Sequence, residues 1–305
     1  MSRRPLHRRP RIGIALGSGS ARGWAHIGVL RGLEELGIVP DVVCGSSIGS
    51  LVGGAYVSGR LDAFEEWIRS LDWKGILRYL DIRLLAGGGF IEGKRLMDFL
   101  RDHIGDVEIE ELSRPFATLA TDLATGREVW LRDGSLLEAV RASIALPGFF
   151  TPVRRGDAWM VDGGLVNPVP VSLCRALGAE VVIAVNLNGD IVGRHIARYT
   201  AEREEKGEGA LRHVEATLLE RLSNGFANLL PTPQGPGIFE VMAASINIMQ
   251  DRITRSRMAG DPPDVLLAPR LAQIALMDYD RSSETIEAGY RCVLRHREFL
   301  EPLVR

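Results

Sequence analysis

Cysteine is scarce in this chain of 305 residues, and the three that occur lie far apart. They are Cys44, Cys174 and Cys292, and no two of them form a C-x-x-C pair. An odd number at such spacing argues against both a disulfide framework and a zinc site. Each lies in an apolar stretch, so we expect buried thiols, which fit a reducing compartment and a cytoplasmic protein.

Long hydrophobic runs and excess charge are also missing. No stretch approaches the ~20 apolar residues of a membrane-spanning helix. A formal net charge of -2 gives no sign of a nucleic-acid partner. Charge of one sign gathers only in the first eleven residues, which hold five arginines. We predict a basic disordered tail over residues 1–10. The alternative hypothesis is that this tail makes peripheral contact with anionic lipids at the inner face of the membrane.

Strand and helix patterns alternate at the start of the chain. Residues 11–16 are predicted to form a strand and residues 24–36 a helix, because apolar residues recur at helical spacing in the second segment. Residues 42–44 form a short apolar strand, and residues 48–56 a helix of small and apolar residues. This order with short connections predicts an α/β fold with a parallel sheet and crossover helices over residues 11–305.

Further elements follow the same logic. Helices are predicted over 61–71, 93–104, 135–144, 169–177 and 282–299, and strands over 116–123, 128–131, 159–161, 180–185 and 265–267. The strands 116–123 and 128–131 are close enough in sequence to form a hairpin. Residues 187–236 carry a charged run and a proline-rich end, so we expect a polar helical insertion there, a candidate lid or docking surface.

The pentapeptide Gly45-Ser46-Ser47-Ile48-Gly49 lies between the second strand and the second helix and fits G-x-S-x-G. A serine on such a sharp turn has its hydroxyl lifted clear of the sheet. Glycine on either side lets the backbone and a substrate approach closely. The helix that follows directs free N–H groups toward the same point, which suits a developing oxyanion. Ser47 is therefore a candidate nucleophile.

A second glycine-rich turn, Gly17 to Gly23, follows the first strand and opens a helix, where backbone N–H groups can hold an anion. A dinucleotide site needs G-x-G-x-x-G, but Arg22 stands at the third glycine. A P-loop needs lysine after the last glycine, where Trp24 stands. The remaining use is to bind the oxyanion that forms when Ser47 attacks an ester carbonyl.

A serine hydroxyl needs a base. The histidines are His7, His26, His103, His195, His213 and His296. None follows a strand at a glycine-bounded turn, and His26 is predicted to be packed in the core. Asp162 does follow a strand, in Met160-Val161-Asp162-Gly163-Gly164. Its ordinary pKa of ~3.9 suits a serine poorly, so we expect burial beside Ser47 to raise that pKa, and a modest turnover on activated or lipid-like esters.

These three motifs together resemble the patatin-like phospholipase family. They stand in the family's order: the Gly17–Gly23 loop with its basic Arg22, Ser47 in G-x-S-x-G, and Asp162-Gly163-Gly164. Three further stretches resemble the bacterial RssA-type members: residues 25–30, 141–148 and 258–264. The resemblance covers the chain from about residue 11 to residue 300, and three ordered motifs make it specific.

The resemblance implies a three-layer α/β/α sandwich with a mainly parallel central sheet. It implies that Ser47 is the nucleophile and Asp162 the base of a dyad that hydrolyses acyl esters of lipids, as a phospholipase A or lysophospholipase does, with no cofactor or metal. The implied oxyanion region consists of Gly17, Ser18, Gly19, Arg22 and Ile48. Ser18 and Ser20 depart from the family's glycines, and Ser18 costs backbone freedom if its φ must be positive.

Two other functions stay open at this point, as does the oligomeric state. An α/β-hydrolase would complete a triad of Ser47 and Asp162 with His195, His213 or His296, although its serine elbow follows more strands than the two seen here. A regulatory or scaffold protein would keep a dyad of low turnover and bind its partner through residues 187–236.

Overall fold

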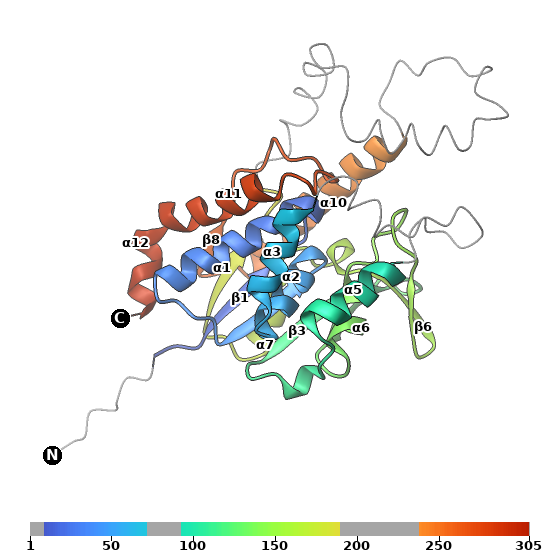
Figure 1. Cartoon of the computed structure of the whole chain (residues 1–305), viewed down its shortest axis with the longest axis horizontal. Helices are drawn as coiled ribbons and strands as arrows, with labels where there is room; N and C mark the ends of the chain where they lie inside the picture. Colours follow the sequence, from blue (N-terminus) through green and yellow to red (C-terminus); the bar gives the residue numbers. More distant parts are fainter. Residues whose placement is uncertain (1–8, 72–92, 190–237, 305) are drawn as a thin grey trace, which may run out of the picture.

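The computed structural model describes residues 9–71, 93–189 and 238–304 (Figure 1). Nearly all of the predicted tail and of the predicted 187–236 insertion lies outside the described residues, so both stay predictions. None of the described helices is both long enough and apolar enough to cross a membrane.

One eight-stranded sheet forms the centre of the molecule. Its strands are β1 (Ile12–Leu16), β2 (Val42–Ser46), β3 (Phe116–Asp122), β4 (Glu128–Leu131), β5 (Val153–Arg155), β6 (Ala158–Asp162), β7 (Val181–Val185) and β8 (Val265–Leu267). The order is β5-β6-β3-β2-β1-β7-β8, and β4 also pairs with β3. The four pairings among β3, β2, β1, β7 and β8 are parallel, and the three that involve β4, β5 and β6 are antiparallel. The predicted mainly parallel sheet is therefore confirmed.

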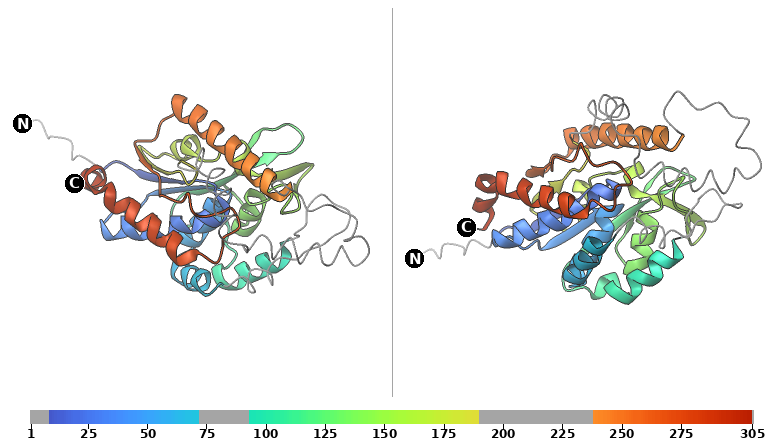
Figure 2. Two further views of the ribbon diagram at one scale, coloured as in Figure 1. Left: turned by 90° about the horizontal axis from the view of Figure 1, so that it is seen from above. Right: turned by 45° about the horizontal axis from the view of Figure 1, so that its top comes forward.

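Helices cover both faces of this sheet (Figure 2). One face carries α1 (Ala25–Glu35), α2 (Ile48–Val57), α3 (Leu61–Ser70), α5 (Lys94–Ile104), α6 (Leu136–Ser143) and α11 (Ser282–Arg295), and the other α7 (Val171–Ala176) and α10 (Ile238–Gly260). Side chains of a strand alternate between the faces. On β1, Ile14 and Leu16 pack into the larger core with α1 and α2, and Ala15 packs into the smaller core with α7. This is the predicted three-layer sandwich.

The middle strand β3 brings two distant segments together along one edge. Its first half pairs with β2, where Leu119 lies opposite Ser46, and its second half pairs with β6, where Ala120 lies opposite Asp162. Because β4 pairs with residues 118–121, β2 and β6 must both use the opposite edge of β3. The end of β6 therefore lies beside the end of β2, although 115 residues separate Ser47 from Asp162.

Several boundaries and two elements differ from the sequence prediction. The predicted closing helix 282–299 ends at Arg295, and a separate short helix, α12 (Arg297–Leu300), follows. The turn between them holds the His296 ring, whose Nδ1 lies 2.8 Å from the Cys292 carbonyl oxygen. The short strand β5 and the long helix α10 had no counterpart in the prediction. All three cysteines are buried free thiols, as predicted.

Candidate active site

Ser47 occupies a strained position between β2 and α2. Its φ of 54° and ψ of -125° are uncommon for any residue but glycine and store on the order of 1–3 kcal/mol of strain. Two hydrogen bonds stabilise this backbone conformation. The Ser47 N–H donates to Ser143 Oγ at 2.9 Å, and the Ser47 carbonyl accepts from the Ser50 N–H at 2.8 Å. The hydroxyl therefore projects from a fixed turn, as G-x-S-x-G predicts.

The flanking glycines are needed because backbones touch there. A Cβ on Gly45 would lie 2.4 Å from the Gly49 carbonyl oxygen. A Cβ on Gly49 would lie 2.2 Å from the carbonyl oxygen of Leu16, at the end of β1. Helix α2 thus begins directly against the first strand, which brings its N-terminus close to the glycine-rich loop.

Asp162 ends β6 and caps the short 3₁₀ helix η3 (Gly163–Leu165). Its Oδ1 accepts from the Gly164 N–H at 2.7 Å, and its Oδ2 accepts from Ser47 Oγ at 2.5 Å. A Cβ on Gly163 would lie 2.3 Å from the Leu119 carbonyl oxygen, so the glycine lets the turn sit against β3. The two residues that the sequence singles out are in direct hydrogen-bond contact.

Burial makes the Asp162 carboxyl a better base than an ordinary aspartate. Its side chain is fully buried, and this raises its pKa from 3.8 to about 7. The hydrogen bonds from Ser47 and the Gly164 N–H stabilise the carboxylate and offset part of that rise. A pKa near the working pH is favourable for proton transfer from a serine hydroxyl. This agrees with the expectation from the sequence.

The histidines do not enter the dyad within the described residues. His26 is buried, its Nε2 lies 2.7 Å from the Gly17 carbonyl oxygen, and burial lowers its pKa to about 4. It is a neutral core residue that supports the loop, as predicted. His195 and His213 lie outside the described residues, and His296 bonds its own helix. Because Ser47 bonds Asp162 directly, the arrangement is not that of a triad with histidine between the two.

The glycine-rich loop uses part of its backbone for its own support. The Gly17 N–H donates to the Val185 carbonyl and the Ser18 N–H to the Pro168 carbonyl, at 3.1 and 2.8 Å. These two amides are therefore taken, which contradicts a donor role for them. Gly19 and Ile48 line the pocket together with Ser47, so the predicted donors narrow to these two. Their role as an oxyanion hole stays a proposal.

Arg22 supports the loop from behind. Its side chain is fully buried; Nε donates to the Gly19 carbonyl at 3.3 Å and a terminal nitrogen donates to Asn247 Oδ1 of α10 at 2.7 Å. A trans peptide directs its C=O and the next N–H to opposite sides. Holding the Gly19 carbonyl inward thus turns the Ser20 N–H away from Arg22, and Ser20 lines the pocket. Arg22 acts through the backbone and does not itself line the pocket.

The two serines in place of glycine differ in their backbone. Ser20 has a φ of 51°, whereas Ser18 does not have a positive φ, so the expected cost falls on Ser20. The Ser20 hydroxyl lies 2.5 Å from the Tyr279 hydroxyl, and Trp24 Nε1 donates to the Tyr279 carbonyl at 3.1 Å. These contacts hold a tyrosine against the loop that the sequence alone did not single out.

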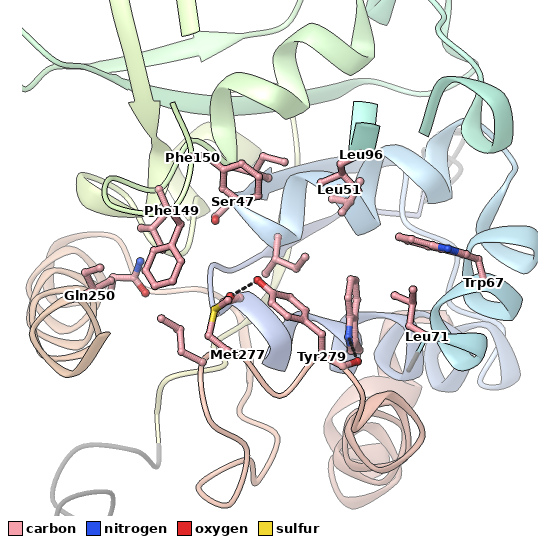
Figure 3. Close-up of a pocket in the computed structure, with 18 residues that line it drawn as sticks. Ser47, Leu51, Trp67, Leu71, Leu96, Phe149, Phe150, Gln250, Met277 and Tyr279 are labelled. Carbon is pink, nitrogen blue, oxygen red and sulfur yellow. Dashed lines mark hydrogen bonds between the residues drawn. The ribbon is translucent and has the colours of Figure 1, made fainter. Parts of the chain in front are cut away.

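A deep apolar pocket opens at Ser47 (Figure 3). Its cavity volume is about 110 Å³, and the pocket is partly open to solvent. In Figure 3, Leu51, Leu96, Trp67 and Leu71 extend to one side of Ser47, while Phe149 and Gln250 lie on the other. Within the described part of the chain, no charged side chain lines it. A pocket of this composition suits an acyl chain.

Comparisons with known proteins identify the family of this chain. Residues 14–175 match the family model for patatin-like phospholipase, a span that holds Ser47 and Asp162. The chain belongs to the patatin-like phospholipase family. An uncharacterized NTE family protein of Mycobacterium tuberculosis is 35% identical over 322 residues, which cover 92% of this chain and 89% of that protein.

Two more distant similarities involve larger proteins. Neuropathy target esterase sws of Drosophila melanogaster is 36% identical over 183 residues, which cover 58% of this chain and 13% of that protein. Among solved structures, VipD from Legionella pneumophila matches with a TM-score of 0.47 at 10% identity, covering 96% of this chain and 67% of that chain.

This member of the family also builds its site from residues that the sequence motifs do not mark. Gln250 and Tyr279 line the pocket, and Asn247 holds Arg22, yet none lies near a glycine-rich turn. The sequence does show polar residues at helical spacing within α10. That pattern is equally typical of a solvent-facing helix surface, so by itself it does not mark Asn247 or Gln250 as site residues.

Proposed function

We propose that this chain is a serine hydrolase that cleaves acyl esters of lipids, of the phospholipase A or lysophospholipase type. The hydrogen bond from Ser47 Oγ to the buried Asp162 carboxyl, at the head of an apolar pocket, carries the proposal. Family membership supports it. The RssA-type subgroup is also a proposal, supported by the stretches quoted above, whereas the relatives found are named for the NTE family.

The chemistry follows from the positions of the two side chains. Asp162 Oδ2 takes the Ser47 proton as Oγ bonds to the ester carbonyl carbon. The carbonyl oxygen becomes an anion, which the N–H groups of Gly19, Ser20 and Ile48 are placed to stabilise; one such donor is typically worth about 3 kcal/mol. When the C–O bond to the alcohol breaks, Asp162 returns the proton to the leaving oxygen. The same carboxylate then deprotonates the water that attacks the acyl-serine ester, and it returns this proton to Ser47 Oγ as the fatty acid leaves.

Fatty-acid release tests the proposal. The wild type is incubated with lysophosphatidylcholine micelles, phosphatidylcholine vesicles and monoacylglycerol, each against a preparation of Ser47→Ala. We expect release of fatty acid from at least one lipid, and none beyond background with the variant. A well-folded wild type that releases none from any of them would contradict the proposal.

The raised pKa of Asp162 sets the pH dependence of the reaction. The base must be deprotonated, so we expect kcat/KM to rise tenfold per pH unit below about pH 7 and to level off above it. Stopped assays from pH 5 to pH 9 measure this limb. Single replacements of His195, His213 and His296 by glutamine serve as controls and are expected to keep it. If any one of these variants lost the rise of kcat/KM below pH 7, the result would favour a Ser-Asp-His triad that includes that histidine.

A further inference from the structure

Helix α10 presents a row of buried polar residues to the site. Asn247, Gln250, Asp251 and Thr254 are all buried, and their spacing places them on one face of the helix. Asn247 accepts from Arg22, and Asp251 pairs with Arg255 on the same helix. Gln250 is the member of this row whose side chain reaches the pocket that holds Ser47.

A hydrogen bond fixes which way the Gln250 carboxamide faces. Asn188 Nδ2 donates to Gln250 Oε1 at 3.0 Å, and the Asn188 backbone N–H is itself tied to Asn186 Oδ1 at 3.0 Å, just beyond the end of β7. With Oε1 turned toward Asn188, the Gln250 NH₂ group must point the other way. Asn186 thus fixes the backbone of Asn188, and the Asn188 side chain in turn fixes Gln250 at the pocket.

The surroundings of Nε2 select the same orientation. A Cβ on Gly164 would lie 2.6 Å from Gln250 Nε2 and 2.9 Å from Asp162 Oδ1, so the amide nitrogen and the carboxylate are near neighbours. A carboxylate favours an N–H donor beside it over a carbonyl oxygen. Within the described residues, Nε2 has no protein acceptor, although the side chain is only 4% exposed. Nε2 is not among the fully enclosed polar atoms without a partner, and Gln250 lines the pocket, so a ligand in the pocket can supply the acceptor.

The position of Gln250 indicates which part of a lipid it meets. Figure 3 shows it beside Phe149, across Ser47 from the apolar side chains of Trp67 and Leu71. An acyl chain that lies against Trp67 and Leu71 places the alcohol half of the ester on the Gln250 side. The partner of Nε2 is therefore an oxygen of that alcohol, and a neutral amide recognises a hydroxyl without needing a charge.

We propose that Gln250 hydrogen-bonds a hydroxyl of the alcohol half of the substrate, and so selects monoacyl esters of glycerol over esters of simple alcohols. This rests on the proposed ester hydrolysis at Ser47. The glycerol hydroxyl is common to a monoacylglycerol and a lysophospholipid, so both belong in the test. Gln250 determines specificity and is distinct from the dyad that carries out the chemistry.

The test compares three esters of one acyl chain: monodecanoylglycerol, decanoyl lysophosphatidylcholine and ethyl decanoate. For Gln250→Leu we expect kcat/KM to fall about tenfold on the glycerol esters, the cost of one hydrogen bond, and less than twofold on the ethyl ester. If kcat/KM falls on only one of the two glycerol esters, the proposal is also supported, and that ester is the one whose hydroxyl the site prefers. The ethyl ester reports that the site is still assembled. Met249→Leu, at an exposed position on the same helix, is the matched control and should change none of the rates.

Three outcomes would overturn the proposal. An equal fall in kcat/KM on all three esters, with the rise of kcat/KM moved to another pH, would mean that Gln250 acts through Asp162. No change on any ester would mean that its NH₂ group meets no substrate. Inactivity of the wild type on all three esters, with release from phosphatidylcholine vesicles, would overturn this proposal alone. Inactivity on the vesicles as well would overturn the proposed function itself, and both are read before any variant is made. Gln250→Asn, which keeps the amide one methylene shorter, should recover part of the preference for glycerol esters.

Discussion

Ser47→Ala is expected to lower the rate of ester hydrolysis by about 10⁴- to 10⁶-fold, since the nucleophile itself is removed. The fold should survive the change, because alanine tolerates the φ of 54° no worse than serine and the lost hydrogen bond is the one to Asp162. Initial rates of fatty-acid release, with thermal melting of both proteins, measure the two effects.

A second variant, Ser143→Ala, keeps the nucleophile and removes a hydrogen bond that positions it. Ser143 Oγ accepts hydrogen bonds from the Ser47 N–H and from the Thr118 hydroxyl. Ser143→Ala should therefore loosen the turn and reduce the rate by about tenfold, the value of one hydrogen bond of about 1.4 kcal/mol. A Ser47→Ala protein that kept a tenth of the wild-type rate would show that another group attacks the ester.

Asp162→Asn is expected to reduce activity and raise stability together. Without a base, the rate should fall by about 10²- to 10⁴-fold. Burial raises the Asp162 pKa from 3.8 to about 7, so the native state keeps this proton to higher pH than the unfolded chain does. The stabilisation from the buried neutral carboxyl is full below pH 4 and is lost as the pH rises to 7. Above pH 7 the wild type carries a buried charge that the amide lacks.

The size of the stability gain follows from the shift in pKa. A difference of about three units corresponds to about 4 kcal/mol, so the free energy of unfolding of Asp162→Asn should exceed that of the wild type by up to this amount at pH 8. Near pH 4 the two should be equal. Urea unfolding at both pH values measures the difference. Equal stabilities at pH 8 would mean that Asp162 is not a buried carboxylate with a raised pKa.

That Ser47 and Asp162 stand at turns was predictable from the sequence, because such turns follow local backbone rules. Ser47 and Asp162 both follow strands and both stand beside glycines, and the contacts of Gly49 and Gly163 show why a side chain is not tolerated there. The parallel part of the sheet was predictable for a similar reason, since apolar strands and helices alternate with short connections. That β2 and β6 share one edge of β3 was not, because register depends on distant pairing.

The rest of the site lay beyond sequence patterns because it is assembled across the fold. The oxyanion role of the glycine-rich loop stays a proposal, and which of its amides are free depends on Val185 and Pro168, whose carbonyls accept from the Gly17 and Ser18 N–H groups. Gln250 comes from α10, whose pattern of polar and apolar residues does not distinguish a buried helix from an exposed one. Two of its buried polar residues, Asn247 and Gln250, bond Arg22 and Asn188, which come from distant parts of the chain.

Labelling with a fluorophosphonate probe tests most directly whether Ser47 is activated by Asp162. The wild type, Ser47→Ala and Asp162→Asn are each treated with the probe between pH 5 and pH 9, and the modified residue is identified by mass spectrometry. We expect the wild type to be labelled at Ser47, at a rate that rises through about pH 7, no labelling of Ser47→Ala, and slow, pH-independent labelling of Asp162→Asn. A folded wild type that resists the probe, or an Asp162→Asn protein that reacts as fast as the wild type, would contradict the dyad.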